Sequence, residues 1–134
     1  MVICAGGGGI PIIYPSSRPG EVVGVEALID KDLASELLAE DVAAGPFVMA
    51  TDVDGVYVGW ATPQQRRLDR VTPEELAGYQ FAAGSMGPKV EAASRFAAKT
   101  GQRAAIGSLA DIAGIVAGQV GTSVVLQLAP DRPA

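Results

Sequence analysis

The chain of 134 residues contains no histidine and a single cysteine. Without histidine, Ser-His-Asp and Cys-His catalysis, histidine general-base schemes and most zinc sites are excluded. One cysteine excludes an internal disulfide and a thiolate cluster. Because Cys4 lies in an apolar segment, we expect it to be a buried structural thiol rather than a nucleophile.

Long apolar runs and basic stripes are also absent from the sequence. No run is long enough to span a bilayer, and the N-terminus lacks the basic-then-apolar pattern of a secretory signal peptide. A cytoplasmic protein without a membrane partner is therefore expected. The net charge of −5 argues against a nucleic-acid partner, since no basic surface is available to replace counterions. The one basic cluster, Arg66, Arg67 and Arg70, lies among acidic residues and indicates a solvated, charge-balanced face.

The composition that remains is typical of an α/β domain. Hydrophobic residues make up 49% of the chain and aromatic residues only 5%, so the core is expected to consist mainly of Ala, Val, Ile and Leu. The length is sufficient for one domain with a real core and too short for two ordinary ones. We therefore expect residues 1–134 to form a single domain.

Strand and helix signals alternate along the chain. Strands are expected at residues 1–5, 10–14, 21–25, 47–50, 104–107 and 122–128, and the second and third of these form a hairpin. Helices are expected after a cap at residue 30 or 32, after a capping box at residue 72, at 88–100 and within 108–118. Leu33, Leu37 and Leu38 are expected to face the core from the first of these helices, and Gly101 to cap the third.

This alternation predicts a mostly parallel sheet between helical layers, with the inserted hairpin as the antiparallel exception. In such sheets, ligands bind outside the carboxyl ends of the strands. The segments Gly6–Gly9, Thr51-Asp52 and Gly107-Ser108 all follow expected strands and can share that edge.

A glycine-rich loop opens directly into a helix at residues 81–93 (FAAGSMGPKVEAA). Pro88 suits the first turn of that helix. Gly84 and Gly87 let the backbone approach a ligand, and free N–H groups at a helix start attract anions. Lys89 stands where the helix dipole disfavours a cation. Taken alone, the segment fits a bound polyanion and equally fits a solvated lysine after a flexible loop.

Three further segments accompany this loop: residues 3–11 (ICAGGGGIP), 26–35 (EALIDKDLAS) and 51–57 (TDVDGVY). In this order, together with Gly-Ser-Met-Gly-Pro-Lys, they closely resemble the carbamate kinases of the amino-acid kinase superfamily. The resemblance extends down to Gly121-Thr122 but matches only the C-terminal half of such a kinase. The family's N-terminal half, with its own glycine-rich phosphate loop, has no counterpart here. The resemblance implies a three-layer α/β sandwich with a mostly parallel open sheet and an inserted β-hairpin.

The resemblance also implies an activity, the reversible transfer of a phosphoryl group between ATP and carbamate to give ADP and carbamoyl phosphate. Lys31 and Lys89 are implied to stabilise the negative charge that develops in the transition state. Asp32 is implied to keep both lysines charged and in place. Mg²⁺ is expected to be held mainly by ATP phosphate oxygens and water, and no structural metal is expected.

The implied nucleotide site comprises seven residues: Asp52, Tyr57, Gly84, Ser85, Met86, Gly87 and Lys89. The run Gly6, Gly7, Gly8 and Gly9 is implied to form a wall of the site for carbamate and the transferred phosphoryl group. Each segment also has a structural interpretation. The four glycines and Asp54-Gly55 suit tight turns, and Asp30-Lys31-Asp32 suits an exposed helix start. Trp60 and Pro63 are expected to serve in packing rather than ligand contact.

Several functions stay open at this point. The chain is expected to supply the ATP-binding half of a carbamate kinase-like enzyme, or half of another amino-acid kinase. It can also be a nucleotide-binding module without catalysis, or a remnant that acts as an interaction domain. With half of the parent fold missing, an uncovered sheet edge is expected to promote self-association or the binding of another polypeptide.

Overall fold

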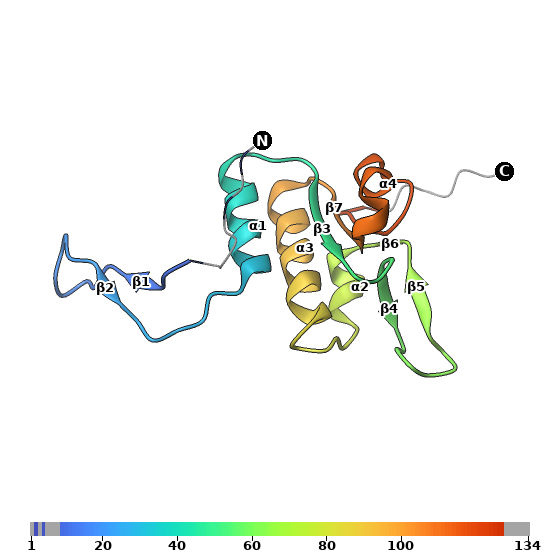
Figure 1. Cartoon of the computed structure of the whole chain (residues 1–134), viewed down its shortest axis with the longest axis horizontal. Helices are drawn as coiled ribbons and strands as arrows, with labels where there is room; N and C mark the ends of the chain where they lie inside the picture. The colour runs from blue at the N-terminus through green and yellow to red at the C-terminus, as the bar shows by residue number, and fades with distance from the viewer. Residues whose placement is uncertain (1, 3, 5–8, 128–134) are drawn as a thin grey trace.

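The computed structural model describes Val2, Cys4 and residues 9–127 (Figure 1). In chain order its elements are β1 (Ile12–Ile13), β2 (Val23–Gly24), α1 (Lys31–Asp41), β3 (Phe47–Thr51), β4 (Val56–Val58), β5 (Arg66–Leu68), β6 (Arg70–Val71), α2 (Pro73–Ala77), α3 (Met86–Thr100), β7 (Ala104–Ser108), the 3-10 helix η1 (Leu109–Asp111), α4 (Ile112–Ala117) and β8 (Thr122–Val124).

The central sheet has four strands in the order β3-β7-β8-β6. β3 is parallel to β7 and β6 is parallel to β8, whereas β7 and β8 are antiparallel. The prediction of a mostly parallel α/β sheet is therefore confirmed, but the reversed β8 was not foreseen. Two glycines with left-handed backbone angles, Gly118 and Gly121, precede β8 and turn the chain so that Thr122 starts beside Ile106.

Helices cover both faces of this sheet (Figure 1). α3 packs on β7 and β3, and α1 packs along the outer side of α3, whereas α4 lies on the opposite face of β7. The buried face of α3 consists of Val90, Ala92, Ala93, Phe96 and Ala97. All positions of β7 before Ser108 are buried, as a strand with a helix on either side requires.

Two hairpins project from this framework. The expected hairpin is present as β1 and β2, with Ile12 opposite Gly24 and Ile13 opposite Val23, and it extends away from the helices (Figure 1). The second hairpin, β4 and β5, was not predicted. Within the described residues, no helix combines the length and the apolar character that crossing a membrane requires.

Local signals for the helix ends are confirmed. The Asp30 side chain accepts hydrogen bonds from the backbone N–H groups of Asp32 and Leu33, which makes Asp30 the cap of α1. Thr72 and Glu75 form the expected capping box of α2. α3 begins at Met86, so Pro88 lies in its first turn, and Gly101 ends it in a left-handed conformation.

Two predictions about burial are wrong. Leu37 and Leu38 are exposed, and the positions of α1 that are buried are Glu36 and Ala39. The reason is that α1 contacts chiefly α3, so the orientation of that helix pair determines the buried face. Cys4 is exposed instead of buried, and it belongs to no described helix or strand. The strand expected at residues 122–128 ends at Val124, and the one at 1–5 falls largely outside the described residues.

A buried carboxyl group lies between α1 and α3. The Glu36 side chain is fully buried, and neither of its oxygens has a hydrogen-bond partner in the structure. The nearest cation, Lys99 Nζ, is 3.8 Å from Glu36 Oε1 and pairs more closely, at 2.9 Å, with Glu40. Burial, reinforced by the neighbouring Glu40, raises the pKa of Glu36 from 4.5 to about 7, against the opposing effect of Lys99 and Arg95.

We predict that this carboxyl group makes the folded chain less stable as the pH rises from about 4.5 to about 7. In that window the unfolded chain releases the proton of Glu36 while the folded chain retains it, so rising pH favours unfolding. Glu36→Gln should remove this contribution, which is on the order of 3 kcal/mol by pH 8. Urea unfolding followed across this pH range measures it.

Glu91→Gln is the matched control, because Glu91 is half-exposed on α3 and pairs with Arg95. The control should keep the pH dependence of the natural chain. An identical pH dependence in Glu36→Gln and Glu91→Gln would contradict the assignment.

Candidate functional site

The carboxyl ends of β3 and β7 lie together at one edge of the sheet. Thr51 and Ser108 end these strands as direct partners, so the expectation that the two segments share an edge is confirmed. The third segment expected there, the glycine run, lies outside the described residues except for Gly9. That glycine has a φ of 108°, a backbone conformation that side-chain-bearing residues rarely adopt.

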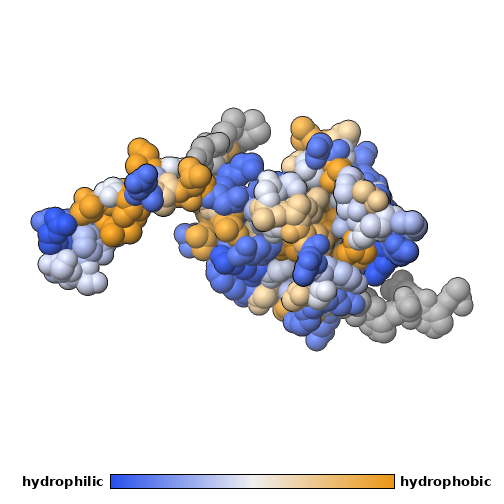
Figure 2. Space-filling model, turned by 90° about the horizontal axis from the view of Figure 1, so that it is seen from below, coloured by the Kyte–Doolittle hydropathy of each residue, from blue (hydrophilic) through white to orange (hydrophobic). Residues whose placement is uncertain are grey.

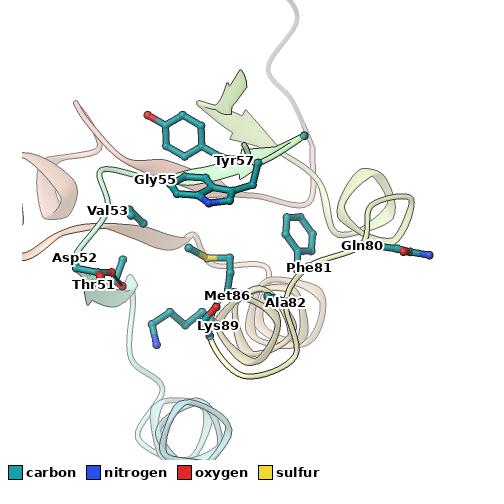
Figure 3. Close-up of a pocket in the computed structure, with 13 residues that line it drawn as sticks. Thr51, Asp52, Val53, Gly55, Tyr57, Gln80, Phe81, Ala82, Met86 and Lys89 are labelled. Atoms are coloured by element: carbon teal, nitrogen blue, oxygen red, sulfur yellow. Dashed lines mark hydrogen bonds between the residues drawn. The ribbon is translucent and has the colours of Figure 1, made fainter. Parts of the chain in front are cut away.

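A cavity of about 390 Å³ opens beside the end of β3. Its walls come from the end of β3, the β4 hairpin, the loop between α2 and α3, and the start of α3 (Figure 3). The residues that line it are Thr51, Asp52, Val53, Gly55, Tyr57, Gly59, Trp60, Gln80, Phe81, Ala82, Ser85, Met86 and Lys89. Large apolar side chains and a few polar groups thus surround one concave space, as is usual for small-molecule sites.

The polar end of the cavity contains a shielded ion pair. Lys89 Nζ donates a hydrogen bond to Asp32 Oδ2 at 2.8 Å, and the two side chains are only 14% and 12% exposed. Lys31 Nζ lies 3.8 Å from the same carboxylate oxygen but is 65% exposed. The structure therefore brings Lys31, Asp32 and Lys89, the three residues with implied catalytic roles, into one cluster. The two ammonium groups on one carboxylate can offer N–H donors to an anionic ligand, while Asp52 adds a second carboxylate to the lining of the cavity.

Five of the seven residues of the implied nucleotide site line the cavity, namely Asp52, Tyr57, Ser85, Met86 and Lys89. Gly84 and Gly87 belong to the same loop but do not line it, so their roles stay predictions. Gly87 allows a close backbone contact, since a Cβ there would lie 3.0 Å from the carbonyl oxygen of Ala82, which accepts the Gly87 N–H.

Two aromatic residues at the cavity were missed by sequence reasoning. Trp60 was assigned to packing, yet it lines the cavity and is 61% exposed. Phe81 also lines the cavity and received no role. The position of Phe81, as the first residue of the glycine-rich loop, was the sequence signal that could have indicated a place at the cavity. Figure 3 shows Phe81 on the same side of the cavity as Ala82 and Met86, facing the strand that carries Tyr57.

A charged network lies behind the aromatic wall. Tyr57 Oη donates a hydrogen bond to Asp54 Oδ1 at 2.8 Å, and Arg67 NH1 donates to Asp54 Oδ2 at 2.7 Å. The hydrogen bond from Tyr57, followed by that from Arg67, lowers the pKa of Asp54, and the same bond raises the pKa of Tyr57. Arg67 also binds Asp69, so its charge is balanced.

Among the residues that the structure describes, no three His, Cys, Asp or Glu side chains gather in a way that could hold a metal ion. The cavity therefore has no metal-binding cluster of described residues. Its polar lining consists of the Asp52 carboxylate, the Lys89 ammonium group and several hydroxyl and amide groups.

Comparison with known proteins identifies the protein family to which this fold and this cavity belong. Residues 3–108 match the model of the amino acid kinase family. The chain belongs to the amino acid kinase family.

Its relatives within that family are carbamate kinases. It is 50% identical to the carbamate kinase of Rhizobium meliloti over 124 residues and 52% identical to that of Haemophilus influenzae, matches that cover 92% of this chain. Among solved structures, the carbamate kinase from Giardia lamblia bound to AMP-PNP superposes with a TM-score of 0.82 at 36% identity, covering 90% of this chain and 43% of that one. The chain spans 38% and 39% of the length of the two curated relatives.

Proposed function

We propose that the chain supplies the nucleotide-binding half of a carbamate kinase-like phosphotransferase. The reaction is the reversible transfer of the γ-phosphoryl group of ATP to carbamate, which gives ADP and carbamoyl phosphate. The observation that carries the proposal is the cluster of Lys31, Asp32 and Lys89 at the polar end of a cavity whose other walls are aromatic and apolar. The relatives named carbamate kinase, and the AMP-PNP complex of one of them, support it.

In this proposal the two lysines stabilise the negative charge that develops during phosphoryl transfer. A carbamate oxygen forms a bond to the γ-phosphorus while the bond from that phosphorus to the ADP oxygen breaks. Negative charge develops on the transferred group and the leaving oxygen, and Lys89 and Lys31 stabilise it. Asp32 holds Lys89 at 2.8 Å and so limits the cost of orienting this ammonium group during the reaction. Mg²⁺ would be held mainly by ATP phosphate oxygens and water rather than by side chains of this chain, and it would supply further positive charge at the phosphates.

A second candidate is a nucleotide-binding module without catalysis, since the nucleotide-site residues line one cavity within these residues. In these 134 residues nothing corresponds to the remaining three-fifths of the curated relatives. Carbamate must be held in line with the γ-phosphoryl group, and a misplacement of about 1 Å can cost on the order of 10²-fold in rate. Binding of the nucleotide requires fewer of these contacts than turnover does.

The first prediction of this proposal is that the isolated chain binds ADP and ATP in the presence of Mg²⁺. Lys89→Ala should weaken this binding roughly 10- to 100-fold, since the lysine is proposed to bind phosphate oxygens directly. Isothermal titration calorimetry measures both affinities. Arg95→Ala is the control, because Arg95 is a half-exposed cation on α3 that pairs with Glu91 away from the cavity. No heat at millimolar nucleotide, or equal losses in the two variants, would overturn the proposal.

The second prediction concerns turnover. The isolated chain should form little or no ATP from ADP and carbamoyl phosphate in a coupled assay. Adding a polypeptide that corresponds to the first half of a carbamate kinase should restore activity, and Lys31→Ala should abolish what is restored. Robust turnover by the isolated chain that Lys31→Ala removes would show that this half is sufficient.

The third prediction concerns association. Figure 2 shows hydrophobic atoms gathered along the projecting β1–β2 segment. Ile10, Tyr14 and Leu28 are more than 70% exposed, and Leu37 on α1 is exposed as well. We propose that another polypeptide or a second copy covers it, because exposed apolar area of this kind promotes association.

Sedimentation at high micromolar concentration tests this third prediction. The natural chain should form oligomers or co-purify with a partner, and the double variant Ile12→Lys, Tyr14→Lys should shift it toward the monomer. A monodisperse natural monomer without a partner would contradict it.

A further inference from the structure

Two separate segments of the chain form opposite walls of the cavity. One is the hairpin of β4 and β5, which pair with each other in a two-stranded sheet of their own. The other is the loop of residues 78–85 between α2 and α3. Figure 3 shows Phe81 and Ala82 of this loop across the cavity from the strand that carries Tyr57. The width of the cavity therefore depends on how the hairpin lies against the loop.

The hairpin is anchored firmly at its inner end. Val56 and Leu68 are cross-strand partners there, and both are buried. The hydroxyl group of Thr122, also buried, accepts the N–H of Val56 at 2.7 Å and donates to the carbonyl of Leu68. The turn at the outer end, residues 59–65, is exposed throughout. The outer end therefore needs a contact of its own to stay against the loop.

A side-chain hydrogen bond supplies this contact. Arg66, at the outer end of β5, donates from NH2 to Tyr79 Oη at 3.0 Å, and both residues are exposed. Within the described part of the chain, no further hydrogen bond or ion pair joins residues 56–68 to residues 78–85. We call this contact the Arg66–Tyr79 bridge.

Tyr79 is held on the loop side of the cavity by two further contacts. Its N–H donates to the carbonyl of the buried Leu76 in α2 at 3.1 Å. Its ring meets the ring of Phe81 edge-on, with centroids 6.4 Å apart and planes at 69°. Phe81 packs against the hydrophobic core and lines the cavity. Arg66 therefore binds a side chain that is itself fixed in the wall opposite the hairpin.

We propose that the Arg66–Tyr79 bridge holds the two walls of the cavity together, and that it must open before a nucleotide can enter or leave. This inference rests on the proposed nucleotide-binding function and concerns the rate of ligand exchange. Arg66 and Tyr79 are positioning residues, because neither of them lines the cavity. The bridge forms in the free chain and in the complex alike.

Such a bridge affects the rates of binding more than the affinity. When it stabilises the free chain and the complex equally, its loss leaves the free energy of binding unchanged. The open form becomes more populated in both states, so association and dissociation accelerate by the same factor. A residue that contacts the ligand, as proposed for Lys89, behaves differently, because its loss weakens the affinity itself.

Stopped-flow mixing measures both rates, with ADP that carries a methylanthraniloyl group on the ribose and a chase of unlabelled ADP for dissociation. Tyr79→Phe and Arg66→Met each remove the bridge but keep the ring or the aliphatic stem. Each should raise both rate constants roughly three- to tenfold and leave Kd within about twofold of the natural value. The double variant should add little, because both changes remove the same bond.

Hydrogen–deuterium exchange tests the bridge without a ligand. In Tyr79→Phe, the backbone amides of residues 57–67 and 78–85 should exchange faster, whereas those of β7 should keep their protection. Arg70→Met is the matched control, since Arg70 is an exposed arginine of the neighbouring strand β6 and lines no part of this cavity. The control should change neither the rate constants nor the exchange.

Unchanged rate constants or unchanged exchange in Tyr79→Phe and Arg66→Met would overturn the proposal. Faster dissociation at an unaltered association rate constant would also overturn it, since the bridge would then stabilise the complex alone. Failure of the natural chain to bind ADP refutes the proposed nucleotide binding. The exchange measurement, which needs no nucleotide, then decides whether the bridge holds the two walls together.

Discussion

The ion pair between Asp32 and Lys89 joins the two helices that organise the candidate site. Asp32 is in the first turn of α1 and Lys89 in the first turn of α3, 57 residues further along the chain. A shielded charge without a partner is costly, so each residue holds the other in place. Because α3 packs on the sheet and α1 packs on α3, this pair determines where Lys31 lies relative to the end of β3.

The same pair of helices encloses charged groups at both ends of its contact. At the cavity, Asp32 and Lys89 are paired at 2.8 Å. In the middle of α1, Glu36 is buried without a hydrogen-bond partner, and near the far end Lys99 pairs with Glu40 at 2.9 Å. The carboxylate at the cavity, Asp32, is therefore better paired than the buried carboxyl group of Glu36. Close pairing suits a site whose cationic groups must be held in position.

The other wall of the cavity depends on one buried hydroxyl group. Thr122 Oγ1 accepts the N–H of Val56 at 2.7 Å and donates to the carbonyl of Leu68, so it fastens both strands of the β4–β5 hairpin to β8. Space around it is tight. A Cβ at Gly55 would lie 2.9 Å from this oxygen and 2.9 Å from Arg67 Cδ. Glycine is needed there for close approach, and the hairpin can then carry Tyr57 and Trp60 over the cavity.

Signals that act within one helical turn or between two neighbouring strands were readable from the sequence. The Asp30 cap, the Thr72 capping box and the Gly101 terminus were predicted because each depends on hydrogen bonds between residues close in the chain. The parallel pairing of β3 and β7 followed from the alternation of strands and helices. The cluster of Lys31, Asp32 and Lys89 was expected through a family resemblance, since nothing in the spacing of residues 57 apart places them together.

The sequence by itself determined the α/β class, the ends of its helices and the types of residue available for phosphate chemistry, because these depend on composition and local pattern. Only the tertiary structure decided which face of α1 is buried, that Cys4 is exposed, and that Trp60 lines a cavity. Each of these depends on which element packs against which. Such packing is a property of distant parts of the chain together, and a pattern read within one segment contains no information about its neighbours.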